Sequence, residues 1–253
     1  DYLIADRIVL PPDQQDFFSE KIVYLPHCYQ ANDSTKAIAA VPRRQQVALP
    51  EAGFVFCCFN NSWKITASMF EIWMRLLRSV PGSVLWLFAD NEGACANLSR
   101  AAGHFGVDPG RLVFAPRIAE AEHLARHGLA DLFLDTLPYN AHTTASDALW
   151  AGLPVLTALG KAFPGRVAAS LLEAVGLPEL VTQTLADYEA MALRLARDPA
   201  MLQSFRERLA ANRLNQPLFD TGRFARDIER AYQTMWEIAQ RGEPPASFAL
   251  AVE

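Results

Sequence analysis

Short apolar runs alternate with amphipathic helical segments along most of this chain, and that alternation limits the folds open to it. The runs, each a candidate strand, cover residues 54–59, 84–88, 112–114, 132–134, 155–157 and 180–181. After the first run, apolar residues repeat at the spacing of a helix that packs on a sheet: Met69, Ile72, Trp73, Leu76, Leu77 and Val80. Strand–helix alternation implies parallel strands with right-handed crossovers. We therefore expect an α/β fold, a Rossmann-like doubly wound parallel sheet over about residues 50–182, with ligands at the carboxyl ends of its strands.

Capping signals predict the ends of two helices. Ser68 and Glu71 have the spacing of a capping box at the start of the first helix. Thr143 is the expected N-cap of a short helix after the fourth run, and Gly152 followed by Pro154 should end that helix. These signals predict helices that begin near residues 69 and 144.

The helix expected to start at Thr143 is a candidate anion site. It follows a buried strand and a polar loop, so its first N–H groups should face outward at the carboxyl edge of the sheet. Free N–H groups and the helix dipole both favour negative charge there, and Asp147 is expected within the first turn. An ordinary capped helix without a ligand is the simpler alternative.

Composition excludes several classes of function. With 253 residues and a net charge of −5, the chain lacks the basic clusters of nucleic-acid-binding proteins. No apolar run approaches the length that spans a bilayer, and no signal peptide opens the chain. Cys57 and Cys58 lie inside the first candidate strand, as expected of core residues in a reducing, cytoplasmic compartment. No cysteine or histidine spacing suggests a metal site.

Several motifs are missing. No Gly-x-Gly-x-x-Gly follows a strand, which disfavours a dehydrogenase-type Rossmann domain, and there is no Walker loop. There is no Asp-x-Asp pair to hold a metal on a diphosphate, and no Gly-x-Ser-x-Gly elbow of a hydrolase. A bound diphosphate would therefore be neutralised by the helix dipole, hydroxyls and basic side chains.

The flanks of the expected sheet differ from it. Residues 1–48 hold strand-like pieces around Leu3 and Val23, so we take the chain to be a fragment whose beginning completes another domain. Beyond Leu185 the chain reads as helix. The last helix, residues 222–240, is expected to bury Phe224, Ile228, Ala231, Tyr232, Met235 and Ala239. Residues 241–253 are expected to be a frayed tail.

Three separated motifs carry a resemblance to a known family. They are Phe-Asn-Asn-Ser-Trp-Lys at 59–64, His-Thr-Thr-Ala-Ser-Asp-Ala-Leu-Trp-Ala-Gly at 142–152 and Arg-Val-Ala-Ala-Ser at 166–170. Together they closely resemble the protein O-GlcNAc transferase family, in particular its bacterial homologues, and the similarity runs almost end to end. The family's catalytic region has two Rossmann-like lobes that face a cleft, the GT-B arrangement, usually preceded by tetratricopeptide repeats.

The resemblance implies a division of the chain and an activity. Residues 1–48 resemble an end piece of the N-terminal lobe with a linker, and residues 49–240 the nucleotide-sugar-binding C-terminal lobe with its terminal helices. The implied reaction is transfer of N-acetylglucosamine from UDP-GlcNAc to Ser or Thr hydroxyls of proteins, with inversion and without a metal or other cofactor. The implied partners are the UDP-sugar donor, a protein acceptor and the missing N-terminal lobe, with no nucleic acid and no membrane. The resemblance assigns no general base.

The resemblance also assigns residues to the diphosphate and the ribose. Lys64 is the implied catalytic residue, because its ammonium would neutralise the leaving diphosphate; a solvated lysine is the simpler reading. The phosphates would receive hydroxyl and main-chain hydrogen bonds from His142, Thr143 and Thr144. Asp147 would accept hydrogen bonds from the ribose hydroxyls.

The base-binding loop is matched by residues 114–123. Main-chain groups of Arg117 and Ile118 would read the edge of the uracil. His123 would stack on the base or border it, although a helix-surface histidine is an equal alternative, and Arg126 lies one helical turn further on.

Two positions depart from the family pattern. Asn61 stands where relatives commonly carry Gln, so a shorter amide must make the equivalent hydrogen bond. Glu120 stands where many carry a lysine that touches the nucleotide, so nucleotide affinity is expected to be weaker or compensated elsewhere. These departures keep two alternatives open: an enzyme like the protein O-fucosyltransferases that uses GDP-fucose, and a non-catalytic nucleotide-binding scaffold.

Overall fold

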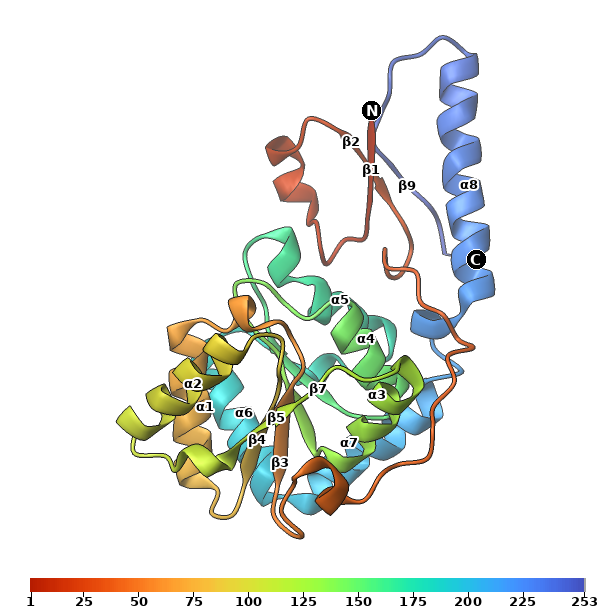
Figure 1. Cartoon of the computed structure of the whole chain (residues 1–253). Coiled ribbons are helices and arrows are strands. Elements are labelled where there is room, and N and C mark those ends of the chain that lie inside the picture. The colour runs from red at the N-terminus through yellow and green to blue at the C-terminus, as the bar shows by residue number, and fades with distance from the viewer. Residues whose placement is uncertain (253) are drawn as a thin grey trace.

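The core of the molecule is a six-stranded parallel sheet with helices on both faces (Figure 1). The computed structural model describes residues 1–252. The strands are β3 (Val55–Cys58), β4 (Val84–Phe88), β5 (Leu112–Ala115), β6 (Leu132–Leu134), β7 (Val155–Ala158) and β8 (Val181–Thr182). All their pairings are parallel, in the order β5-β4-β3-β6-β7-β8. The predicted doubly wound α/β sheet is therefore confirmed, and its strand order reverses between β3 and β6.

The central strands are apolar because helices cover both of their faces. Every residue of β3, β6 and β7 is buried, including Cys57 and Cys58. Strands covered on both sides read as continuous apolar runs, and for this reason the predicted strands match to within about two residues.

Seven helices accompany this sheet: α1 (Ala67–Ser79), α2 (Glu92–His104), α3 (Glu120–Arg126), α4 (Thr143–Trp150), α5 (Val167–Ala174), α6 (Leu185–Arg197) and α7 (Pro199–Asn212). Figure 1 shows α1, α2 and α6 on one side of the sheet and α3 and α4 on the other. The predicted capping box of α1 is wrong, because the N-cap is Thr66, whose hydroxyl accepts from the N–H of Met69. Ser68 is already helical, and Glu71 pairs with Arg75 at 2.9 Å.

A second, smaller sheet gathers the two ends of the chain. It consists of β1 (Tyr2–Ala5), β2 (Lys21–Tyr24) and β9 (Phe248–Ala249) in the order β1-β2-β9 (Figure 1). The prediction of a frayed tail is wrong at β9, which pairs in parallel with β2. The reason is that β2 offers a free edge of N–H and C=O groups, and the returning chain pairs with it.

The long helix α8 (Thr221–Gln240) packs on this small sheet. Ala231 is buried there as predicted, but Tyr232 is 57% exposed and Ala239 is also exposed, while Ile238 is buried. Tyr232 follows Ala231 directly and so lies about 100° around the helix from it, outside a narrow apolar stripe. No helix within residues 1–252 has the length and apolarity needed to cross a membrane.

Polar contacts join the small sheet to the larger unit. The carboxylate of Asp6 accepts from the hydroxyl of Ser170 on α5 at 2.6 Å. Arg166, just before α5, donates through Nε to the carbonyl of Ile8 at 2.5 Å and through Nη1 to that of Gly160 at 3.0 Å. The motif at 166–170 thus holds the two sheets together in this structure.

Candidate functional site

A pocket opens at the carboxyl ends of β3, β4 and β5, where ligands bind in sheets of this type. Its volume is about 380 Å³, and we call it the strand-end pocket. It is lined by Phe59, Asn61, Phe88, Arg117, Ile118, Glu120, His123, Arg126 and Thr144. Six of the ten residues predicted from sequence therefore lie together here: Asn61, Arg117, Ile118, His123, Arg126 and Thr144.

A larger hollow lies at the opposite edge of the sheet. It measures about 850 Å³ and is lined by residues before β4 and β5, among them Ser83 and Arg111. The guanidinium of Arg111 is already bonded to the carbonyls of Ser83, Leu77 and Val80. Because that edge holds the amino ends of the strands, we place the candidate site in the strand-end pocket.

The inner wall of the strand-end pocket is formed by Phe59, His123 and Arg126. Arg126 is buried, donates to the carbonyl of Pro116 at 2.7 Å and lies 4.8 Å from the centre of the Phe59 ring. Its guanidinium also bonds to Nδ1 of His123. Burial and the neighbouring Arg126 lower the pKa of His123 to about 4, so this ring is neutral at pH 7, with Nδ1 as the acceptor. A neutral ring beside Phe59 suits an aromatic base better than a phosphate.

The outer wall is exposed. The guanidinium of Arg117 lies 5.4 Å from the centre of the Phe88 ring, and Ile118 is 37% exposed. Both residues lie in the loop between β5 and α3, at the mouth of the strand-end pocket. Their main-chain groups would thus lie close to a ligand in this pocket, and their recognition of the uracil edge stays a prediction.

Lys64 lies in a short 3-10 helix, Ser62–Lys64, soon after β3. Its ammonium donates to the carbonyl of Asn140 at 2.8 Å and lies 4.3 Å from the centre of the Tyr139 ring. Burial lowers the pKa of Lys64, and the charge of Asp135 opposes that shift. An ammonium has three N–H groups, and Asn140 takes one, so donors remain for an anion.

The start of α4 differs by one residue from the prediction. Thr143 is the first helical residue, so the N-cap is His142, whose side chain caps nothing. The carbonyl of His142 accepts from the N–H groups of Ala145 and Ser146 at 3.0 and 3.1 Å. The His142 ring instead stacks on Tyr139 at 4.9 Å and bonds through Nε2 to the carbonyl of Pro164. Because no side chain caps the helix, its first N–H groups are left for a ligand.

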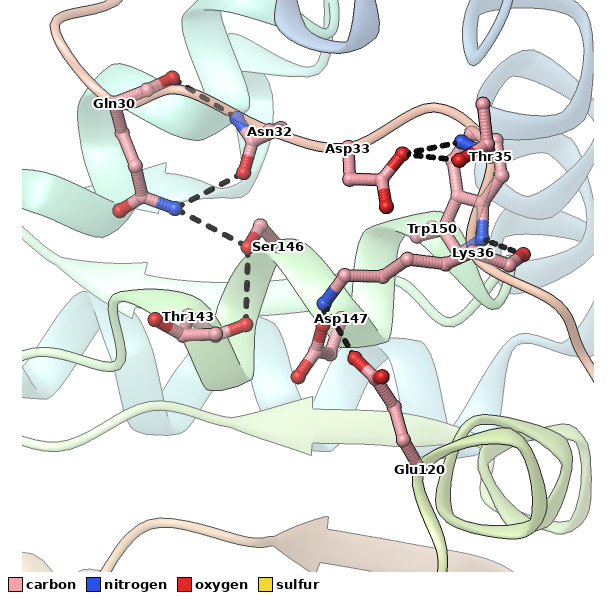
Figure 2. Close-up of polar contacts among 10 residues, drawn as sticks. All are labelled: Gln30, Asn32, Asp33, Thr35, Lys36, Glu120, Thr143, Ser146, Asp147 and Trp150. Carbon is pink, nitrogen blue, oxygen red and sulfur yellow. Dashed lines mark hydrogen bonds and ion pairs between the residues drawn. The ribbon is translucent and has the colours of Figure 1, made fainter.

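The threonines of α4 have different surroundings. Thr143 is exposed, whereas the Thr144 hydroxyl donates to the amide oxygen of Asn60 at 2.5 Å. Asp147 is the fifth residue of α4, so its predicted place in the first turn is wrong. Its carboxylate accepts from the ammonium of Lys36 at 2.7 Å (Figure 2). Gly152, with φ of +85°, follows the helix end as predicted.

Sequence reasoning missed Asp135, which organises the loop between β6 and α4. This buried carboxylate accepts from the N–H of Ala141 at 2.6 Å and from the hydroxyl of Thr157 at 2.7 Å. Burial raises the pKa of Asp135 to about 6 against the effect of these hydrogen bonds. Its position directly after a buried parallel strand was a signal that could have found it.

Sequence reasoning also missed Lys36, which reaches the site from the linker between the two sheets, residues 25–54. Its ammonium lies 2.7 Å from Asp147 and 3.0 Å from Glu120 (Figure 2). No pattern in the sequence links these three positions. Within residues 1–252, no three His, Cys, Asp or Glu side chains are grouped as ligands for a metal ion.

Comparisons with known proteins agree with this architecture. The model of Glycosyl transferase family 41 matches residues 31–228. A probable UDP-N-acetylglucosamine–peptide N-acetylglucosaminyltransferase of Arabidopsis thaliana, SEC, is 38% identical over 98% of this chain and 26% of its own length. A UDP-N-acetylglucosamine–peptide N-acetylglucosaminyltransferase of Caenorhabditis elegans is 37% identical over 79% of this chain and 18% of its own length. The chain thus spans about a quarter or less of these relatives.

Solved structures show the same architecture. A mutant O-GlcNAc transferase of Thermobaculum terrenum superposes with a TM-score of 0.86 at 32% identity, covering 96% of this chain and 46% of that one. The Anabaena protein HepE in complex with UDP and glucose has a TM-score of 0.58 at 17% identity, covering 85% of this chain and 57% of its own, and supports the fold alone. On the family match and the coverage by relatives, the chain belongs to glycosyltransferase family 41.

Proposed function

We propose that this chain is the UDP-binding lobe of an inverting, metal-independent glycosyltransferase that moves N-acetylglucosamine from UDP-GlcNAc to Ser or Thr hydroxyls of proteins. The names of the relatives support the donor and the acceptor class. One observation carries the proposal: a pocket lined by a neutral histidine beside Phe59 opens on the same edge of the sheet as the ammonium of Lys64 and the uncapped start of α4.

The proposed mechanism rests on charge. As the acceptor oxygen attacks the anomeric carbon, the bond to the diphosphate breaks and negative charge grows on the leaving UDP. Donors already aimed at that charge stabilise the transition state more than the ground state. Here those donors are the ammonium of Lys64 and the N–H groups of Thr143 and Thr144, the first residues of α4. Asp147 is the proposed acceptor for the ribose hydroxyls.

The remaining parts of the proposal concern the whole protein. We propose that an N-terminal lobe completes the cleft and supplies part of the donor-sugar and acceptor surroundings, and that tetratricopeptide repeats precede it. We propose a cytoplasmic location, in keeping with the free cysteines of the described chain. The short share of each relative that this chain covers leaves room for such additional domains.

The first test is calorimetric titration of the protein with UDP and then with GDP, both in EDTA. Saturable binding of UDP without binding of GDP is the expected result. Preference for GDP would redirect the donor to GDP-fucose. Absence of binding by either nucleotide would favour the non-catalytic scaffold, with Glu120 and Asn61 as marks of a degenerate site.

The second test is transfer itself. The full-length protein, given UDP-GlcNAc and a library of Ser- and Thr-containing peptides, should release UDP and add one N-acetylhexosamine per modified hydroxyl by mass spectrometry. Proton NMR of the product should report a β-glycoside, since the donor is α-linked and the reaction inverts. Retention at the anomeric carbon would contradict the proposed mechanism.

A further inference from the structure

The linker between the two sheets is attached to helices α3 and α4. The carbonyl of Lys36 accepts from the indole N–H of Trp150 on α4 at 3.1 Å. Three residues later, the N–H of Ala39 donates to the carbonyl of Ala121 on α3 at 3.0 Å. Lys36 therefore leaves the linker from a backbone position that hydrogen bonds define on both sides.

The side chain of Lys36 joins two carboxylates of unequal exposure (Figure 2). Asp147 is 12% exposed and accepts at 2.7 Å, whereas Glu120 is 66% exposed and accepts at 3.0 Å. Because Glu120 lines the strand-end pocket, the ammonium lies at the rim of that pocket. Glu120 can exchange its contact for water, while Asp147 has much less access to solvent.

The charge state of Asp147 depends on this cation. Burial raises its pKa, and the negative charge of Glu120 adds to that shift, while Lys36 opposes both through a hydrogen bond and its charge. Two further titratable groups of α3 line the same pocket: His123 is neutral at pH 7 because its pKa is about 4, and the guanidinium of Arg126 is bonded to His123 and to the carbonyl of Pro116. Lys36 is therefore the group that favours the carboxylate form of Asp147.

We propose that Lys36 is a positioning residue of the donor-nucleotide site, which keeps Asp147 ionised and oriented to accept hydrogen bonds from the ribose hydroxyls of a uridine nucleotide. The inference rests on the proposed function, since it requires a nucleotide in the strand-end pocket. It assigns the linker a part in ligand binding. It also explains how a glutamate is accommodated at position 120, since a lysine from the linker supplies the positive charge at this rim.

The test is calorimetry of the whole protein with UDP and with uridine, which lacks phosphates, at pH 8.0 and 5.5. Lys36→Met should weaken binding of both ligands about tenfold at pH 8.0, the size expected when a hydrogen bond from a charged group is lost. The ratio of variant to wild-type Kd should grow at pH 5.5, because loss of Lys36 raises the pKa of Asp147 further, so that Asp147 is protonated at a higher pH in the variant than in the wild type. Titration of the UDP phosphates affects both proteins equally and therefore cancels in this ratio. Lys36→Arg, which keeps the positive charge, should retain most of the wild-type affinity for both ligands at both pH values.

Matched variants separate the proposal from general effects of charge. Lys21→Met removes an exposed lysine of the small sheet and should bind like the wild type. In an Asp147→Asn background, Lys36→Met should add little further loss, because the two residues act as one unit. If Lys36→Met does not fold, Lys36→Gln, which keeps a donor without the charge, takes its place in the same comparison.

Three outcomes would overturn the proposal. Unchanged affinity of Lys36→Met at both pH values would remove Lys36 from the site. A loss for UDP without a loss for uridine would mean that the ammonium acts on phosphate and not through Asp147. Failure of the wild type to bind UDP and uridine would reject the proposed function itself, and this inference with it, which distinguishes the two failures.

Discussion

Replacement of Lys64 by Met tests the proposed chemistry most directly. Methionine keeps the length of the side chain and its packing against Tyr139, and it removes the ammonium that donates to Asn140. Because burial already lowers the pKa of Lys64, loss of the charge relieves a desolvation cost, which offsets the lost hydrogen bond of about 1 kcal/mol. We therefore expect folding to be little affected.

The magnitude follows from the charge on the leaving group. A full unit charge about 4 Å from an ammonium interacts with it by about 4 kcal/mol at an effective dielectric constant of about 20. Loss of one preorganised donor from a site of developing charge costs about 3–4 kcal/mol, so kcat should fall about 10²- to 10³-fold. Binding of UDP should weaken only about tenfold, since in the proposed site the N–H groups at the start of α4 also donate to the diphosphate.

The assay measures kcat for peptide glycosylation by the full-length protein, together with the Kd for UDP by calorimetry. Lys21→Met is the control for loss of a lysine at an exposed position, and thermal unfolding verifies that each variant is folded. Losses of near-equal size in kcat and in UDP affinity would refute the assignment of Lys64 to the transition state, because they would describe uniform binding.

Three further predictions concern charge and the small sheet. Glu120→Gln should strengthen UDP binding about twofold, since it removes an anion from the strand-end pocket. The control Glu122→Gln lies on the same helix but outside the pocket, and it should leave the Kd for UDP unchanged in the same calorimetric titration. The pKa of Asp135 is about 6 in the native state, above its value in the unfolded chain. Over pH 4–6 the native state therefore binds more protons than the unfolded state, so the free energy of unfolding falls as pH rises through that window. The stability gap between wild type and Asp135→Asn, measured by urea unfolding, should therefore shrink by about 2 kcal/mol from pH 4.5 to 7.5; a constant gap would contradict the raised pKa. Phe248→Ala should cost about 1–2 kcal/mol of unfolding free energy, because Phe248 is half-buried where β9 pairs with β2. Phe17→Ala, at an 83% exposed position, should cost far less, and equal melting temperatures of the two variants would mean that β9 adds no stability.

The sequence alone determined the architecture and the edge of the sheet that carries the candidate site. Strands covered on both faces are mainly apolar, so β3, β6 and the first half of β7 could be recognised from continuous apolar runs. The carboxyl ends of parallel strands meet at one edge, so residues after β3 and after β5, such as Asn61 and Arg117, could be expected to line one pocket, and they do.

The sequence did not predict the exact N-cap or every buried position of a helix, because neighbouring residues can take the same role. Thr66 and Ser68 both have the chemistry of an N-cap, and the path of the chain into α1 selected Thr66. On α8 the predicted stripe packs on the small sheet at Phe224, Ile228, Ala231 and Met235. Tyr232 and Ala239 are exposed instead, and Ile238 is buried.

Only the tertiary structure decided the contacts between distant segments. Lys36 reaches Asp147 across 111 positions, and Ser247 accepts from the N–H of Ile22 across 225. Local periodicity carries no information on which distant charge or strand edge will be adjacent, because that depends on how whole elements pack. The apolar pattern therefore predicts the fold, whereas the ion pair between Lys36 and Asp147 depends on where folding brings the linker.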